Sequence, residues 1–222
     1  MSTPGTPASA TQSAEIVREY GPFGDGTRAN GVTHDGRQVW VATGNALVAF
    51  DPASGRSAQQ IACACDAGTA FDGRHLYQVA EARIDKIDPA SGRVVASIPA
   101  PGQGGDSGLA WAEGHLWVGQ YRERRIHQID PETGAIVRTI ESNRFVTGVT
   151  WVDGELWHGT WEEEQSDIRR IDAVDGRVLQ RLELPPGTGV SGLESDGAEL
   201  FYAGGGSNGR VRAIRRPPRR PD

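Results

Sequence analysis

The sequence lacks any hydrophobic run long enough to cross a membrane. No stretch of its 222 residues approaches the ~18 consecutive apolar residues of a membrane span. Residues 1–13 contain Ser, Thr, Ala, Pro and Gly with no apolar run and no basic residue. This composition excludes the hydrophobic region of a secretory signal and predicts a disordered leader over residues 1–13. These absences predict a cytoplasmic protein without a membrane partner.

Positive charge is also scarce, since the net charge is −6. Phosphate binding needs a cationic face, so this charge argues against a nucleic-acid partner. Basic residues cluster at the C-terminal end, and we interpret residues 217–222 as a solvated tail rich in Pro and Arg.

Cysteine is rare, and both copies, Cys63 and Cys65, lie in the segment CACD. In an extended segment, residues i and i+2 point the same way, so the two thiols converge beside Asp66. Such a pair can bind a soft ion or sense redox state, but structural zinc sites use four ligands. The alternative is a pair of reduced thiols without a function.

Glycine and turn residues, by contrast, are abundant and recur in a repeated pattern. The unit Gly108–Glu141 contains four short apolar runs separated by turns, which indicates a four-stranded antiparallel sheet. Four other segments follow the same plan, with a Gly at 31, 68, 108, 148 and 192 and an aromatic residue nine positions later in each. The aromatic residues are Trp40, Tyr77, Trp117, Trp157 and Phe201. The period predicts an all-β, five-bladed propeller with four-stranded blades.

The two ends of the repeat array complement each other. Residues 14–20 resemble a fourth strand without a preceding blade, and the fifth repeat ends after three strands. We expect residues 14–20 to pair with residues 210–215 and close the ring, which would hide two strand edges. The propeller would then occupy residues 14–216 as one domain.

The loops that lead into the first strands carry the first group of candidate site residues. Asp66 and Asp106 lie two positions before the repeated Gly, and Glu194 lies two positions after it. The three carboxylates could line one central funnel and hold a divalent metal ion, another cation or a substrate amine. Alternatively, the Asp residues accept hydrogen bonds from loop N–H groups.

The loops between second and third strands carry the second group. Blade 3 presents Gln120 and Tyr121, and blade 4 presents Trp161 and Glu162. His158, in the second strand of blade 4, is either a packed core residue or a general base oriented by Glu162 or Glu81.

Two units, GLAWAEGHLWVGQYRERRIHQIDPETGAIVRTI and GVTWVDGELWHGTWEEEQSDIRRIDAVDGRVL, carry a resemblance to known blades. They resemble the plant and bacterial-type glutaminyl-peptide cyclotransferases and, more loosely, the streptogramin-lyase and quinoprotein-like propellers. The first family uses acidic residues and Trp around its central cavity to bind an N-terminal glutamine and assist attack of its amine on the side-chain amide. The resemblance therefore implies such parts for Trp161, Glu162 and Glu81.

Two functions remain open at this stage. In one, Glu81, His158 and Glu162 are catalytic, and Asp66, Asp106, Gln120, Tyr121, Trp161 and Glu194 bind a small molecule or a peptide terminus. In the other, the propeller is a noncatalytic module whose rim holds a ligand, a metal or a protein partner.

Overall fold

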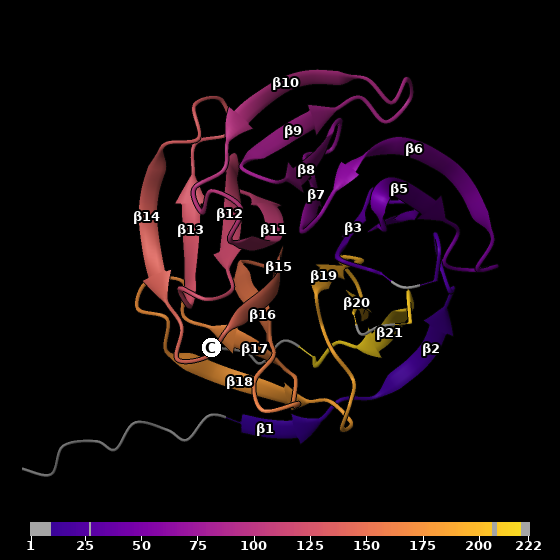
Figure 1. The fold of residues 1–222 in the computed structure, drawn as a ribbon. Coiled ribbons are helices and arrows are strands. Elements are labelled where there is room, and N and C mark those ends of the chain that lie inside the picture. Colours follow the sequence, from indigo (N-terminus) through magenta and orange to yellow (C-terminus); the bar gives the residue numbers. More distant parts are fainter. Residues whose placement is uncertain (1–9, 27, 206–207, 219–222) are drawn as a thin grey trace, which may run out of the picture.

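The computed structural model describes residues 10–26, 28–205 and 208–218, and it is a five-bladed β-propeller (Figure 1). The described residues contain strands and turns but no helix. Blade 1 comprises β3 (Gly31–His34), β4 (Val39–Ala42), β5 (Gly44–Phe50) and β6 (Ser57–Cys65). Blade 2 comprises β7 (Thr69–Phe71), β8 (Leu76–Ala80), β9 (Arg83–Ile87) and β10 (Val94–Pro99).

The remaining blades repeat this arrangement. Blade 3 comprises β11 (Asp106–Ala112), β12 (His115–Gln120), β13 (Arg125–Ile129) and β14 (Ile136–Glu141). Blade 4 comprises β15 (Val146–Val152), β16 (Glu155–Thr160), β17 (Asp167–Ile171) and β18 (Val178–Glu183). Blade 5 comprises β19 (Gly192–Ser195), β20 (Leu200–Gly204), β21 (Val211–Arg215) and β2 (Ile16–Tyr20).

An Asp begins the turn between the third and fourth strands of blades 1 to 4, at Asp51, Asp88, Asp130 and Asp172. In blade 3, Asp130 Oδ1 accepts hydrogen bonds from the N–H groups of Glu132 and Thr133 at 3.0 and 2.8 Å. Gly134 then adopts a φ of 74°, which a residue without Cβ reaches at no steric cost. Asp and Gly therefore stabilise the hairpin that leads to the outer strand.

The repeated Gly and aromatic residues hold neighbouring blades together. A Cβ at Gly68, Gly108, Gly148 or Gly192 would lie within 2.6 Å of backbone atoms in the next blade, so glycine permits the inner strands to meet around the axis. The five aromatic residues are buried, and the Trp117 ring stacks on Trp151 of the next blade with centroids 5.1 Å apart. These contacts join neighbouring blades.

The N-terminal segment closes the ring as predicted. Strand β2 pairs antiparallel with β21, with Tyr20 opposite Val211. Tyr20 is buried, and its ring lies 4.8 Å from that of Phe50 in blade 1 and 6.2 Å from that of Tyr202 in blade 5. The closing strand therefore also contributes to the core between the first and last blades.

A strand precedes this closure where the sequence predicted a disordered leader. Strand β1 (Ala10–Ser13) runs parallel to β18 and makes blade 4 five-stranded (Figure 1). The expectation is corrected for residues 10–13, and residues 1–9 lie outside the described part of the chain. Residues 10–13 carry little apolar surface, so their order comes from backbone pairing with the exposed edge of β18.

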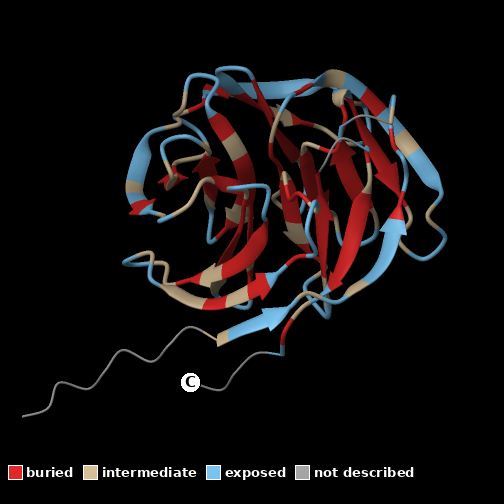
Figure 2. Ribbon diagram, turned by 60° about the horizontal axis from the view of Figure 1, so that its bottom comes forward, coloured by how far each residue is buried: buried red, intermediate tan, exposed pale blue. Residues whose placement is uncertain are grey.

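Burial follows the distance from the axis. The inner strands are mostly buried, whereas β1, β2, β10 and β14 present largely exposed residues (Figure 2). Within the described residues, no helix has the length and hydropathy needed to cross a membrane. The basic tail predicted at residues 217–222 falls largely outside the described residues, which end at residue 218.

Candidate functional site

A cavity of about 500 Å³ opens at the axis, on the face formed by the loops that lead into the inner strands. Each blade contributes the residue immediately before its repeated Gly. These residues are Asn30, Ala67, Ser107, Thr147 and Ser191. The other lining residues are Asp66, Asp106, Tyr121, Trp161, Gly189 and Val190. The structure thus brings four of the predicted ligand-binding residues into one cavity.

Asp106 is a buried carboxyl group at this cavity. The N–H of Gly102 donates to Oδ1 and Oδ2 at 3.0 and 2.9 Å, and the side chain of Gln120 adds a further hydrogen bond. Burial nevertheless raises the pKa of Asp106, because removal of water disfavours the charged form more than these hydrogen bonds favour it. Gln120, predicted to contact ligand, instead orients Asp106 from behind the cavity wall.

Asp66 provides a second carboxyl group, and it is exposed. Its Oδ2 accepts a hydrogen bond from the backbone N–H of Glu81 at 3.2 Å. Glu81 therefore holds Asp66 through its backbone, in the left-handed conformation with a φ of 54°. The Glu81 side chain is not among those that line the cavity.

Tyr121 and Trp161 form an aromatic wall between blades 3 and 4. The Tyr121 ring stacks on Phe145 with centroids 4.8 Å apart, and its hydroxyl donates to the Trp161 carbonyl at 3.4 Å. The guanidinium of Arg124 lies 4.4 Å from the Phe145 ring centroid on the outer side of this stack. Arg124 thus supports the wall through a cation–π contact with Phe145.

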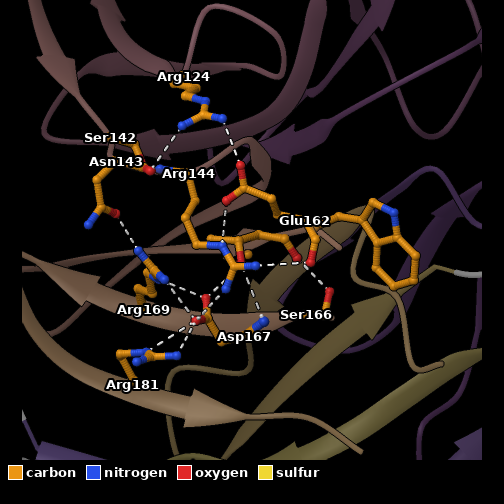
Figure 3. A network of polar contacts seen from close by, with 12 residues as sticks. Arg124, Ser142, Asn143, Arg144, Glu162, Ser166, Asp167, Arg169 and Arg181 are labelled. Carbon is orange, nitrogen blue, oxygen red and sulfur yellow. Dashed lines mark hydrogen bonds and ion pairs between the residues drawn. The ribbon is translucent and has the colours of Figure 1, made fainter. Parts of the chain in front are cut away.

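Glu162, predicted to be catalytic, belongs to the support of this wall (Figure 3). Its Oε1 accepts from Arg124 at 2.7 Å, and its Oε2 accepts from Arg144 at 2.9 Å. Arg144 also donates to the Glu162 carbonyl at 3.0 Å. Both carboxylate oxygens are occupied, one by Arg124 of blade 3 and the other by Arg144 of the loop between β14 and β15. Glu162 therefore fixes the segment after Trp161, and it is not among the residues that line the cavity.

A buried carboxylate, Asp167, organises the rest of this network (Figure 3). Arg169 donates to both of its oxygens, at 2.7 and 2.9 Å, and Arg181 lies 3.0 Å from Oδ2. Hydrogen bonds from Arg169 and Thr160 and the charges of Arg169 and Arg181 lower the pKa of Asp167 despite its burial. Asp167 therefore has a structural role, because the loss of one partner from a buried, fully hydrogen-bonded ion pair strongly destabilises the folded state.

His158 is fully buried between the strands of blade 4. Its Nδ1 bonds to the Gly159 carbonyl at 2.9 Å, and its Nε2 has no partner among the described residues. Burial lowers its pKa to about 4, so the imidazole is neutral at physiological pH. Among the described residues, the structure shows no hydrogen bond or ion pair that joins His158 to Glu81 or Glu162. The predicted catalytic group is therefore not assembled, and the packed alternative describes His158.

Glu194 lies deeper along the axis than the cavity. It follows Ser191 of the cavity and the close-packed Gly192, so the glycine ring separates it from Asp66 and Asp106. Its carboxyl group accepts hydrogen bonds from Thr33 of blade 1 at 3.0 Å and Thr150 of blade 4 at 2.5 Å. Burial raises the pKa of Glu194 to about 7. Glu194 thus joins three blades, and the expectation that it shares a funnel with the two Asp residues is corrected.

The two cysteines lie at the end of β6 on the outer side of blade 1. Cys65 is buried and Cys63 is half-buried. The Cys65 thiol contacts the Ala46 carbonyl at 3.1 Å. A hydrogen bond from the Cys63 thiol lowers the pKa of Cys65 and raises that of Cys63. In the part of the chain that the structure describes, no group of three or more His, Cys, Asp or Glu side chains is placed to hold a metal ion.

The ring of residues directly before the repeated Gly was not predicted. Strict alternation predicts that the positions two before and two after the Gly lie on one face. A β-bulge between Asp106 and Leu109, and its counterpart between Val146 and Val149, shifts this alternation. Alignment of the repeats could have identified the column Asn30, Ala67, Ser107, Thr147 and Ser191. The repeats could not have predicted the bulges that shift the alternation in blades 3 and 4.

Comparisons with known proteins agree with this architecture. Residues 80–217 match the family model described as outer membrane protein assembly factor BamB, which is more than half of the chain. A search of curated proteins gave no match.

Solved structures resemble the whole propeller. A glutaminyl cyclase from Myxococcus xanthus has a TM-score of 0.78 at 17% identity, covering 93% of this chain and 97% of that one. The Cps50 (Swd1) propeller domain of Myceliophteria thermophila has a TM-score of 0.57 at 10% identity, covering 92% and 100%. The protein U3-55K has a TM-score of 0.57 at 10% identity, covering 92% and 98%. At these identities the likeness concerns the fold.

Proposed function

This chain belongs to the family described as outer membrane protein assembly factor BamB, and from that premise we propose that its propeller binds an amine-bearing small molecule or peptide terminus in the axial cavity. A cytoplasmic location remains a prediction of the sequence.

One observation carries this proposal. The cavity of about 500 Å³ combines two carboxyl groups, Asp66 and Asp106, with the aromatic side chains Tyr121 and Trp161. None of the described residues that line it is Lys or Arg. Carboxylates and aromatic faces both attract ammonium groups, and pockets of roughly 300–1,000 Å³ suit small ligands. The lining therefore favours a cation with an apolar body.

A cyclotransferase-type reaction is the finer proposal. In this reaction the α-amine nitrogen of an N-terminal glutamine attacks the side-chain amide carbon, a lactam bond forms, and the amide nitrogen leaves as ammonia. Asp106 would take the proton from the attacking amine and return it to the leaving nitrogen, since a carboxyl group with a raised pKa suits general acid–base work. The resemblance of the blades and the fold of the M. xanthus glutaminyl cyclase support this choice.

Ammonia release from a glutamine-initiated dipeptide tests the reaction. We expect turnover in the wild-type chain and a loss of roughly 100-fold or more in Asp106→Asn, because general acid–base groups contribute factors of about 10² to 10⁴. The matched control is Glu132→Gln, which removes an exposed carboxylate on a distant turn and should leave turnover unchanged.

Equal turnover in Asp106→Asn and wild type would reject Asp106 as the acid–base group. Saturable binding without ammonia release would instead support the noncatalytic module. That alternative is favoured by one specific observation, the placement of Glu81, His158 and Glu162 outside the cavity lining.

A further inference from the structure

The two cysteines occupy a β-bulge at the end of β6, outside the axial cavity. Cys65 pairs with Gly44 and Ala62 pairs with Ala46, so β6 advances three residues where β5 advances two. The bulge leaves Cys63 and Ala64 without regular partners and redirects their side chains. Ala64 is exposed, whereas Cys65 is buried and Cys63 half-buried. Both sulfur atoms therefore lie on the inner side of the strand.

The sulfur atoms contact each other and a group of backbone donors. The Cys63 thiol donates a hydrogen bond to Cys65. The N–H groups of Thr43, Gly44 and Ala46 face the Cys65 sulfur, and that of Leu47 faces Cys63. Converging backbone N–H groups form a concavity that stabilises anions. Thr43 and the start of β5 thus favour the thiolate of Cys65, whose sulfur also lies 3.1 Å from the Ala46 carbonyl, whereas the hydrogen bond to Cys65 and burial raise the pKa of Cys63.

We propose that Cys63 and Cys65 form a two-coordinate site for one soft monovalent cation of the Cu(I) class. Thiolate ligands select Cu(I), whereas zinc in structural sites takes four ligands. No third His, Cys, Asp or Glu joins the pair among the described residues, which fits a linear pair of sulfur ligands.

The charge balance of binding follows from the ligands. Each thiol releases one proton to solvent, and two sulfur–metal bonds form without any change in oxidation state. The resulting complex carries one negative charge, which the N–H groups of Thr43, Gly44, Ala46 and Leu47 stabilise. Half-buried Cys63 gives the ion access, and buried Cys65 shields it from water.

Anaerobic titration of the reduced full-length chain with Cu(I) tests the site. Native mass spectrometry should show one copper per chain, and X-ray absorption should show two sulfur neighbours per copper. Binding to the folded state should also raise the melting temperature. Cys63→Ser and Cys65→Ala should each abolish the bound copper, and Ala64→Ser, which alters the exposed residue between them, should retain it.

Several outcomes would overturn the site. Copper retained in either cysteine variant would mean that one thiol suffices. A single sulfur neighbour per copper, or no copper in the wild-type chain, would identify the pair as packing residues. Circular dichroism of the half-buried Cys63→Ser variant keeps the test valid if Cys65→Ala does not fold.

Discussion

Burial moves the pKa of three side chains near the axis, and the direction depends on which form is charged. It raises the pKa of Asp106 and Glu194, since their ionised forms lose water. It lowers the pKa of His158, whose protonated form is the charged one. Asp106 lines the cavity, so its shift bears on the binding and the chemistry that we propose there. Glu194 and His158 do not face it, and their shifts affect stability.

Glu194→Gln is expected to remove one component of the pH dependence of stability. The folded pKa is about 7 and the ordinary value is 4.5, so between these values the folded chain binds more protons than the unfolded chain. The stability contributed by this group is fully present below about pH 4.5 and is lost as pH rises through the folded pKa of about 7. Gln retains hydrogen bonding to Thr33 and Thr150 without a charge, so the variant should be more stable well above the folded pKa, by about 3 kcal/mol.

Urea unfolding of both proteins between pH 4.5 and pH 8 measures this difference. We expect a gap that widens as pH rises through about 7 and levels off about one pH unit above the folded pKa of Glu194. A gap that is independent of pH would show that Glu194 does not titrate between its folded and unfolded values.

The sequence identified candidate residues by their type and repeat position, but it did not reveal which side chains contact them in the fold. Asp66 and Asp106 could be placed together because they occupy the same position in neighbouring repeats. Glu162 could not be recognised as a support, since its partners Arg124 and Arg144 lie 38 and 18 residues earlier in the chain. The repeats left His158 as either a packed core residue or a general base, and its burial, which depends on packing in the fold, identifies it as packed.

The two N-terminal strands, β1 and β2, contribute differently to the ring. Strand β2 completes blade 5 and buries Tyr20, whereas β1 adds a short, mainly exposed strand to blade 4. The sequence predicted β2 because its apolar pattern matches other outer strands. It could not predict β1, whose segment ATQS has no such pattern and becomes ordered by pairing with β18.

Two truncations should separate these strands. Removal of residues 1–13 deletes β1 and should lower the melting temperature by only about 2–4 °C, since one short edge strand contributes about 1 kcal/mol. Removal of residues 1–20 also deletes β2 and the buried Tyr20 ring, which should lower it by roughly 10 °C or unfold the chain.

Differential scanning calorimetry distinguishes the two cases. Equal small shifts for both truncations would show that β2 is dispensable for closure. Equal large shifts would show that β1 is as important as β2.

At the scale of the whole molecule, a near-symmetric ring carries an asymmetric cavity. Blades 2 and 3 supply the carboxyl groups, blades 3 and 4 supply the aromatic wall, and blade 5 supplies Gly189 and Val190. Arg124 lies over the Phe145 ring. Arg124 and Arg144 also bind Glu162, the residue after Trp161 (Figure 3). The repeats thus fix the position of the site, and the differences among blades fix its chemistry.

Calorimetric titration of an alanine-initiated dipeptide tests the central claim most directly, because this ligand offers a free amine but cannot cyclise. We expect saturable binding to the wild-type chain and to Glu132→Gln. We expect affinity to fall about tenfold or more, equivalent to about 1.4 kcal/mol, for the N-acetylated peptide and for Asp66→Asn. Equal binding of the free and acetylated peptides, or no binding of either, would contradict an amine site at the axis.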